Sequence, residues 1–143
     1  MDAAIELKDV TKTFGQTVAV KDLNLSIPYG GLYGFIGPNG AGKTTTIRLI
    51  MSILFPDAGE IAVLGHASAL EAKKRIGYLP EERGVYRKMR VGAFLSYMAG
   101  LKGVRTHDVD KIVRTSLERV GLGGTEKKRC EELSKGMLQK VQF

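Results

Sequence analysis

The sequence predicts an α/β fold, and three observations support it. Alternating apolar residues near the N-terminus indicate strands. Six of the 18 glycines fall between Gly30 and Gly42, where an apolar run precedes them and a helical pattern follows. From about residue 84 onward, apolar residues recur at helical spacing instead. A chain of 143 residues is long enough to bury a sizeable core.

Composition excludes several classes of protein. Hydrophobic residues make up 43% and charged residues 26%, which excludes a disordered tail and a coiled-coil rod. The single cysteine, Cys130, excludes an internal disulfide framework. The longest apolar stretch, Ile47 to Phe55, contains Arg48 and is far shorter than the roughly 20 residues of a membrane span. The first residues show no signal-peptide pattern, so we expect a cytosolic protein.

Charge is unevenly distributed along the chain. The net charge is +7, but residues 1–70 hold 5 Lys/Arg against 6 Asp/Glu, whereas residues 71–143 hold 17 against 9. The basic half suits an anionic partner such as nucleic acid, lipid headgroups or an acidic protein surface. The alternative, which we favour, is a set of helices with solvated basic faces.

The first 36 residues predict strands and turns. Alternation predicts a half-buried strand at residues 23–27 and a weaker one at residues 5–7. Turns are predicted at residues 14–16 and 28–31. The apolar run Leu32–Ile36, bounded by glycines, predicts a strand buried on both faces.

Helical and extended patterns follow in turn. Ile47, Ile50, Met51 and Leu54 have the spacing of an amphipathic helix that ends at residues 56–59. We then expect a strand at 60–64, a short helix at 70–75 and a strand at 76–79. Two further helices are predicted by the apolar positions in 91–98 and in 109–120, the second ending at Gly121. Residues 139–143 predict a helix cut short.

A phosphate-binding loop is the strongest motif. The segment matches G-x-x-x-x-G-K-[ST] in full and consists of Gly37, Pro38, Asn39, Gly40, Ala41, Gly42, Lys43 and Thr44. Glycines let the backbone wrap around a phosphate chain, and the following helix adds its positive N-terminal end. Lys43 is expected on the β- and γ-phosphates, the Thr44 hydroxyl on Mg²⁺, and Thr45 on the α-phosphate. No Asn-Lys-x-Asp motif is present, which argues against a GTPase.

A second motif opens the last predicted helix. Residues 133–140 read Leu-Ser-Lys-Gly-Met-Leu-Gln-Lys, about ninety residues after the loop. A Ser and a Gly at a helix N-terminus can bind an anion, and a Ser there is also an ordinary N-cap.

Taken in order, these motifs resemble the ATP-binding subunit of ABC transporters over the whole chain. Phe14 occupies the place of the aromatic residue that stacks on adenine, and residues 37–45 match the Walker A loop. Residues 78–81 match the segment that holds the Q-loop. Residues 133–140 resemble the signature motif, usually Leu-Ser-Gly-Gly-Gln. The trans-nucleotide residues implied are Ser134, Lys135, Gly136 and Met137.

The sequence departs from the family pattern at two motifs. Glu81 replaces the Q-loop glutamine, and its carboxylate can also ligate Mg²⁺. The signature has Lys135 for glycine and Met137 for glutamine. Lys135 either approaches a γ-phosphate or extends into solvent. Both changes resemble those found in one branch of the family, whose members power ABC-2-type exporters, including sodium- and drug-export systems.

The family's Walker B aspartate and catalytic glutamate have no counterpart here. No run of four apolar residues ends in Asp or Glu. Neither His66 nor His107 lies where the switch histidine belongs, and we expect both at the surface. We therefore expect a chain truncated just after the signature motif, which binds ATP but does not turn it over.

The resemblance implies a P-loop NTPase core with an N-terminal antiparallel β subdomain and a helical subdomain, incomplete at the C-terminus. The expected divisions are 1–83, 84–132 and 133–143. The implied cofactors are ATP and Mg²⁺. The implied partners are a second ATP-binding subunit, in a head-to-tail dimer, and a transmembrane permease that holds the protein on the inner face of the membrane.

We do not expect nucleic acid as a partner. Two alternatives stay open: a soluble ABC ATPase that acts on the ribosome or nucleic acid, and a non-catalytic nucleotide-binding remnant.

Overall fold

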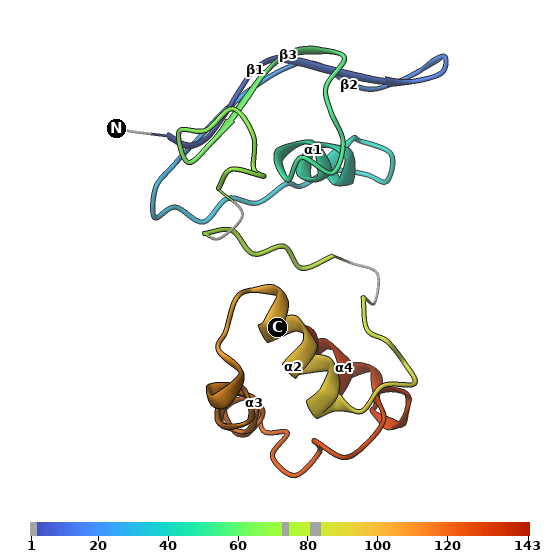
Figure 1. Ribbon diagram of the computed structural model, residues 1–143. Helices are drawn as coiled ribbons and strands as arrows, with labels where there is room; N and C mark the ends of the chain where they lie inside the picture. The colour runs from blue at the N-terminus through green and yellow to red at the C-terminus, as the bar shows by residue number, and fades with distance from the viewer. Residues whose placement is uncertain (1–2, 73–74, 81–83) are drawn as a thin grey trace. The chain divides into compact units, whose positions relative to one another are not determined.

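The computed structural model describes residues 3–72, 75–80 and 84–143. The chain forms two compact units, Met1–Tyr78 and Leu79–Phe143. The first is built on a β-sheet and the second is helical (Figure 1).

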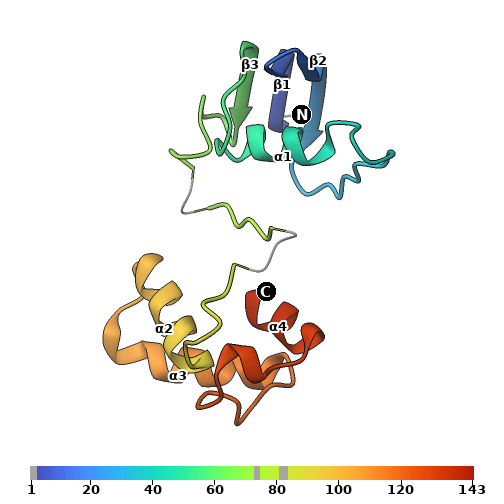
Figure 2. The same ribbon diagram turned by 90° about the vertical axis from the view of Figure 1, so that its right-hand side faces the viewer.

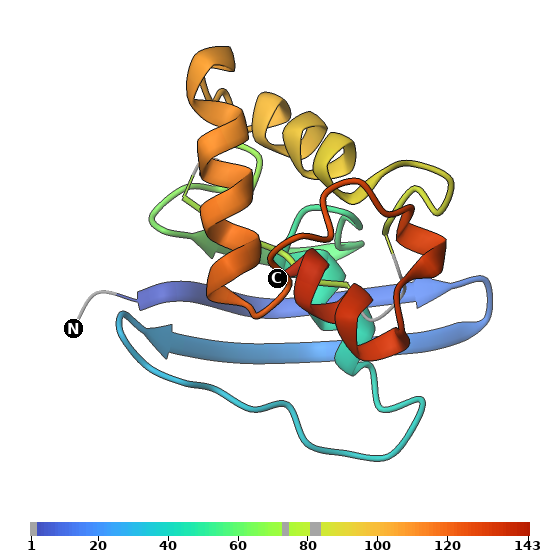
Figure 3. The same cartoon turned by 90° about the horizontal axis from the view of Figure 1, so that it is seen from below.

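The sheet of the first unit has three antiparallel strands in the order β2-β1-β3. They are β1 (Ala3–Phe14), β2 (Thr17–Pro28) and β3 (Ala58–Val63). All three confirm predicted strands, although β1 and β2 are 12 residues each and therefore longer than expected. The predicted turn at residues 14–16 joins them, and β1 and β2 form one long hairpin (Figure 3).

Two aspartates interrupt the alternation of the hairpin. Asp9 and Asp22 both have positive φ, at 50° and 44°, and the β1–β2 register shifts around them. As a result Leu7 and Val10, three positions apart, both point into the core. Such bulges add a residue to one strand, which explains why a strict period of two predicts only part of each strand.

Helix α1 (Lys43–Ile50) packs on one face of this sheet (Figure 2). Its core-facing residues are Thr46, Leu49 and Ile50. The predicted stripe was therefore partly wrong: Ile47 is 37% exposed, and Leu54 follows the helix and packs against the core from a turn. The core of this unit consists of Leu7, Val10, Val20, Leu49, Ile50, Val63 and Ala69.

Two predicted strands were wrong. Residues 32–36 have no regular structure, and Leu32 and Ile36 are fully exposed. Residues 76–79 are also irregular. A strand buried on both faces needs hydrogen-bonding neighbours at its edges, and within the described residues no strand pairs with either segment. Only Phe35 and Ile76 of these runs pack against the core.

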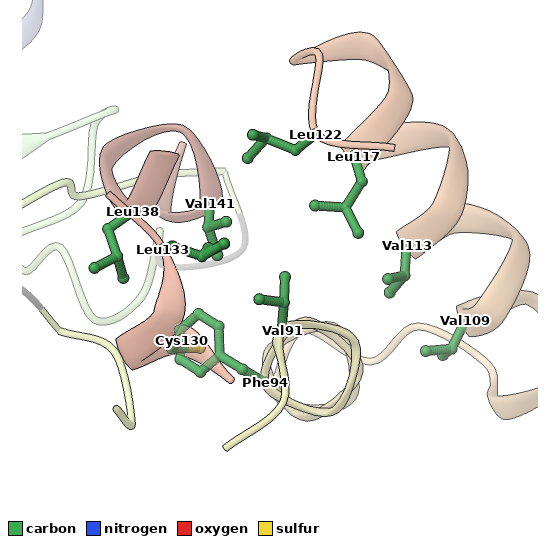
Figure 4. Close-up of a cluster of buried hydrophobic side chains, with 10 residues drawn as sticks. All are labelled: Val91, Phe94, Val109, Val113, Leu117, Leu122, Cys130, Leu133, Leu138 and Val141. Atoms are coloured by element: carbon green, nitrogen blue, oxygen red, sulfur yellow. The ribbon is translucent and has the colours of Figure 1, made fainter. Parts of the chain in front are cut away.

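The second unit confirms the predicted helices. It contains α2 (Val91–Leu101), α3 (Thr106–Arg119), a 3₁₀ turn (Cys130–Glu132) and α4 (Lys135–Gln142). Gly121, with φ 72°, ends α3 as expected. Ten side chains form its core (Figure 4): Val91, Phe94, Val109, Val113, Leu117, Leu122, Cys130, Leu133, Leu138 and Val141.

The N-terminus of α2 is held by backbone rather than by a side-chain cap. The N–H of Val91 donates to the carbonyl of Lys128, and that of Gly92 to the carbonyl of Glu126, both at 2.9 Å. Desolvation raises the pKa of the Cys130 thiol, which is fully buried beside this segment.

Both histidines are exposed, as predicted. His66 lies 3.4 Å from the carboxylate of Glu71, and His107 lies 3.1 Å from that of Asp108. The predicted helix at 70–75 falls partly outside the described residues, and residues 70–72 form turns. In the described part of the chain, no helix combines the length and apolar character needed to cross a membrane.

The helical core predicts a contrast between two residues of α3. Leu117→Ala removes a side chain that is 1% exposed, so we expect a loss of about 3 kcal/mol in the free energy of unfolding. Ile112→Ala, on the same helix but 43% exposed, should cost less than about 1 kcal/mol. Urea unfolding followed by circular dichroism measures both. Equal losses in the two variants would contradict the burial of Leu117 and the exposure of Ile112.

Candidate nucleotide-binding site

The glycine-rich loop connects β2 to α1 without regular structure (Figure 3). Gly42 is the N-cap of α1, has φ 82° and supplies no side chain, so no side-chain cap is made there. Gly40 also has a left-handed φ, 85°. Both positions require glycine, because other residues are strained in this region. The uncapped first turn of α1 presents backbone N–H groups, which with the helix dipole favour an anion.

Lys43 directs its ammonium group into the loop. Its Nζ donates to the carbonyls of Gly37 and Pro38, both at 2.6 Å. The side chain is thus held by the loop that precedes it. A positive charge and a helix N-terminus therefore both lie at the loop formed by residues 37–42.

The threonines that follow differ in burial. Thr46 is buried and ties α1 to the loop, since its N–H and hydroxyl both donate to the carbonyl of Gly42, at 2.8 and 2.9 Å. Thr44 is exposed and Thr45 half-buried. The N–H of Ala41 donates to the carbonyl of Pro38 at 3.3 Å, and residues 37–41, Asn39 included, are exposed.

The loop packs directly on the hairpin that carries Phe14. A Cβ on Gly42 would lie 2.5 Å from the carbonyl oxygen of Ala19 and 3.3 Å from Val20 Cγ2. Ala19 is two residues along β2 from Thr17, which pairs with Phe14. The phosphate-loop glycine and the aromatic residue are therefore brought to the same end of the hairpin.

Phe14 is half-exposed at 48%. Lys12 lies over its ring, with Nζ 5.7 Å from the ring centroid, within the range of a cation–π interaction. Asp57 accepts from Lys12 Nζ and from the N–H and hydroxyl of Thr13, each at 2.7 Å. These bonds, that from Lys12 foremost, lower the pKa of Asp57 from 3.8 to about 2.

A Mg²⁺ ion needs few protein ligands at such a site, because it usually keeps several waters and binds substrate phosphates. The exposed Thr44 hydroxyl, in the first turn of α1, fits that requirement. Glu81, the second expected ligand, lies outside the described residues.

The signature-like residues lie at the start of α4. Ser134 is its N-cap, and its Oγ accepts the N–H of Met137 at 3.3 Å. Ser134, Lys135 and Gly136 are exposed, whereas Met137 is half-buried against the helical core. Tyr78, in the segment expected to hold the Q-loop, is 36% exposed and has no regular structure.

The architecture and the loop define a P-loop nucleotide-binding protein, and comparison with known proteins gives the family. The ABC transporter family model matches residues 20–143, so the chain belongs to the ABC transporter ATP-binding family. Phe14 precedes the matched range. The expected α/β fold is also confirmed: a solved ATP-binding subunit of an ABC transporter superposes with a TM-score of 0.83 at 26% identity, covering 97% of this chain and 59% of that one.

Relatives in bacteria carry the same domain. An ABC transporter ATP-binding protein of Bacillus subtilis, YhaQ, is 46% identical over 97% of this chain and 47% of its own length. The bacitracin transport ATP-binding protein BcrA of Bacillus licheniformis is 34% identical over 99% of this chain and 46% of its own. The chain therefore spans about half the length of the relatives it matches.

Sequence reasoning missed Asp57 and Lys12. Residues 56–59 read only as the end of a helix, and Lys12 only as a charge within a strand. Their meeting depends on the pairing of β1 with β3, across 45 residues of sequence. The aspartate that follows Pro56 is a turn residue by type, so local sequence holds no signal for its second role.

The contact between Gly42 and β2 yields a prediction. Gly42→Ala would place a Cβ against the Ala19 carbonyl at a left-handed φ, so we expect about 1–3 kcal/mol lower stability and weaker nucleotide binding. Gly100→Ala in α2 meets nothing within 4 Å and should be neutral or slightly stabilising. Thermal unfolding and nucleotide titration compare the two. A Gly42→Ala protein that melts like wild type would contradict the close approach.

The lowered pKa of Asp57 makes stability depend on pH. Because the folded-state pKa of about 2 lies below the unfolded-state pKa, the ionised carboxylate stabilises the fold above about pH 4. That contribution is lost as the pH falls from about 4 toward 2. We expect wild type to exceed Asp57→Asn in unfolding free energy at pH 7, and the difference to shrink over that interval. A difference independent of pH would show that the charge is not involved.

Proposed function

We propose that residues 37–45 bind the triphosphate of Mg²⁺-ATP and that Phe14 stacks on the adenine. The observation that carries the proposal is the convergence of Lys43 Nζ and the uncapped N-terminus of α1 on one glycine loop. Two independent sources of positive potential at one point favour a polyanion. The Phe14 ring, half-exposed on the hairpin against which the loop packs, offers an apolar face for a base.

In the whole protein we infer phosphoryl transfer to water. The groups assigned here would act by positioning and by neutralising charge, without covalent chemistry of their own. Lys43 and the first-turn amides would hold the phosphate oxygens, and the Thr44 hydroxyl and Glu81 would hold Mg²⁺. When bound, Mg²⁺ would neutralise negative charge on the phosphates.

We further infer that Ser134, Lys135, Gly136 and Met137 serve the nucleotide of a second subunit in a head-to-tail dimer. Ser134, Lys135 and Gly136 are exposed at the N-terminus of α4, where a phosphate could be received. Two relatives support a role in export through a membrane permease: the bacitracin transport protein BcrA, and the Nod factor export ATP-binding protein I of Rhizobium etli, which is 36% identical over 96% of this chain and 45% of its own length. Attachment to the inner face of the membrane would follow from that permease.

These 143 residues, tested by themselves, should bind ATP without turning it over. No run of four apolar residues in the sequence ends in an acidic residue of the kind that would activate water. Steady phosphate release that Lys43→Ala abolishes would contradict this expectation.

Nucleotide titration tests the site directly. Lys43→Ala removes the ammonium from the loop and should weaken ATP binding about 10- to 100-fold, with or without Mg²⁺. Thr44→Ala should weaken only the binding that depends on Mg²⁺, so that its affinity in magnesium approaches that in EDTA. Lys21→Ala, an exposed lysine on β2, is the matched control for charge. Equal affinity in wild type and Lys43→Ala would overturn the site.

A further inference from the structure

Asp57 is outside the phosphate loop and touches β1 just before Phe14. Its backbone N–H donates to the carbonyl of Thr11 at 2.9 Å. One carboxylate oxygen accepts Lys12 Nζ, and the other accepts both the N–H and the hydroxyl of Thr13. Four hydrogen bonds from a single residue thus hold the three residues that lead to the aromatic ring.

Asp57 lies where the pairing between β1 and β3 ends. The pairing of β1 with β3 ends at Thr11 and Ala58, so beyond this point no β3 backbone accompanies β1. The Thr13 N–H would lack a partner on that side, and the Asp57 carboxylate replaces the missing strand carbonyl. On the other side, Phe14 and Thr17 pair next to the hairpin turn. Asp57 therefore holds the edge of β1 that β3 leaves unpaired, at the strand end that carries Phe14.

Lys12 extends this support to the ring itself. Its side chain is only 16% exposed, and its ammonium is shared between the Asp57 carboxylate and the face of Phe14. An ammonium on a four-carbon stem has many rotamers, and an ion pair of 2.7 Å selects the one that places it over the ring. The ring remains half-exposed and keeps surface for a second partner.

Asp57 is also connected, through α1, to the phosphate loop. The chain leaves α1 at Met51 through turns in which the N–H groups of Ile53 and Leu54 donate to the carbonyl of Arg48, at 2.9 and 3.1 Å. It reaches Asp57 three residues later. The helix that begins at the phosphate loop is thereby linked through a short hydrogen-bonded segment to the strand end that carries the aromatic residue.

We propose that Asp57 is a positioning residue for base recognition, acting through Lys12 and Thr13 to hold the Phe14 ring in place for the adenine. In this role it would act without contacting base or phosphate. The inference rests on the proposed function, since it concerns how the same nucleotide site distinguishes a nucleotide from a bare triphosphate.

The experiment compares binding of ATP with binding of inorganic tripolyphosphate, which has the phosphates but no base. In wild type, both should bind, ATP more tightly. Asp57→Ala should weaken ATP binding about tenfold, the scale of one base–aromatic stack, and leave tripolyphosphate within about twofold. Phe14→Ala should do the same. In the Phe14→Ala background, Asp57→Ala should have no further effect, because its route to the base is gone.

Asp22→Asn is the matched control. This aspartate lies in the same hairpin and hydrogen-bonds to the Thr11 hydroxyl, at 3.0 Å through its N–H and 3.2 Å through its carboxylate, and in the described residues it makes no hydrogen bond or ion pair with Lys12 or Thr13. It should leave the ratio of ATP to tripolyphosphate affinity unchanged. If Asp57→Ala fails to fold by circular dichroism, Lys12→Met takes its place. That variant keeps the apolar stem, removes the ammonium, and should reduce the same ratio.

The outcomes separate this inference from the proposed function. If Asp57→Ala weakens both ligands equally, or neither, the positioning role is wrong while the site stands. A loss that persists in the Phe14→Ala background would equally overturn it. If wild type binds neither ligand, or Lys43→Ala binds both as wild type does, the proposed function itself fails.

Discussion

The nucleotide-binding unit depends on one close backbone approach, that of Gly42 to the carbonyl of Ala19. The contact has no room for a Cβ, and the left-handed φ of Gly42 is unfavourable for any side chain, so two separate constraints demand glycine there. Through this contact the loop is seated on β2, and β2 continues through the hairpin turn to Phe14. The relative placement of the glycine loop and the Phe14 ring thus depends on one glycine.

A second support lies at the opposite edge of the hairpin. Where β3 stops accompanying β1, a carboxylate takes over the role of strand backbone and also pairs with Lys12. Side-chain substitution for a missing ladder partner is a local solution, because it satisfies a donor without extending the sheet. The hairpin is consequently held at both of its strands. Backbone packing of Gly42 holds β2, and charge-assisted hydrogen bonds of Asp57 hold β1.

The helical unit presents its signature-like residues in a different way. Leu133, Leu138 and Val141 anchor α4 in a continuous apolar core, and Ser134 caps the helix between them. Since the buried residues fix the helix from within, core packing does not constrain the exposed Lys135 and Gly136, whereas Ser134 is constrained as the N-cap. Lys135, in place of the family glycine, is exposed and is not part of the apolar core. Gly136 is likewise under no local steric constraint, because a Cβ at this position would meet no atom within 4 Å among the described residues.

Local sequence patterns were sufficient to predict the phosphate loop, the helices of the second unit, and the strands whose residues alternate. Each depends on neighbours within a few residues, as with the stripe Val109, Val113 and Leu117, which local periodicity reports directly. The tertiary fold selects which apolar runs become strands, because Leu32–Ile36 has the composition of a buried strand but no partner among the described strands. It also decided that Asp57 meets Lys12 and that Gly42 meets Ala19. These contacts join residues that sheet pairing and helix packing bring together across many positions, and no short-range pattern encodes such distances.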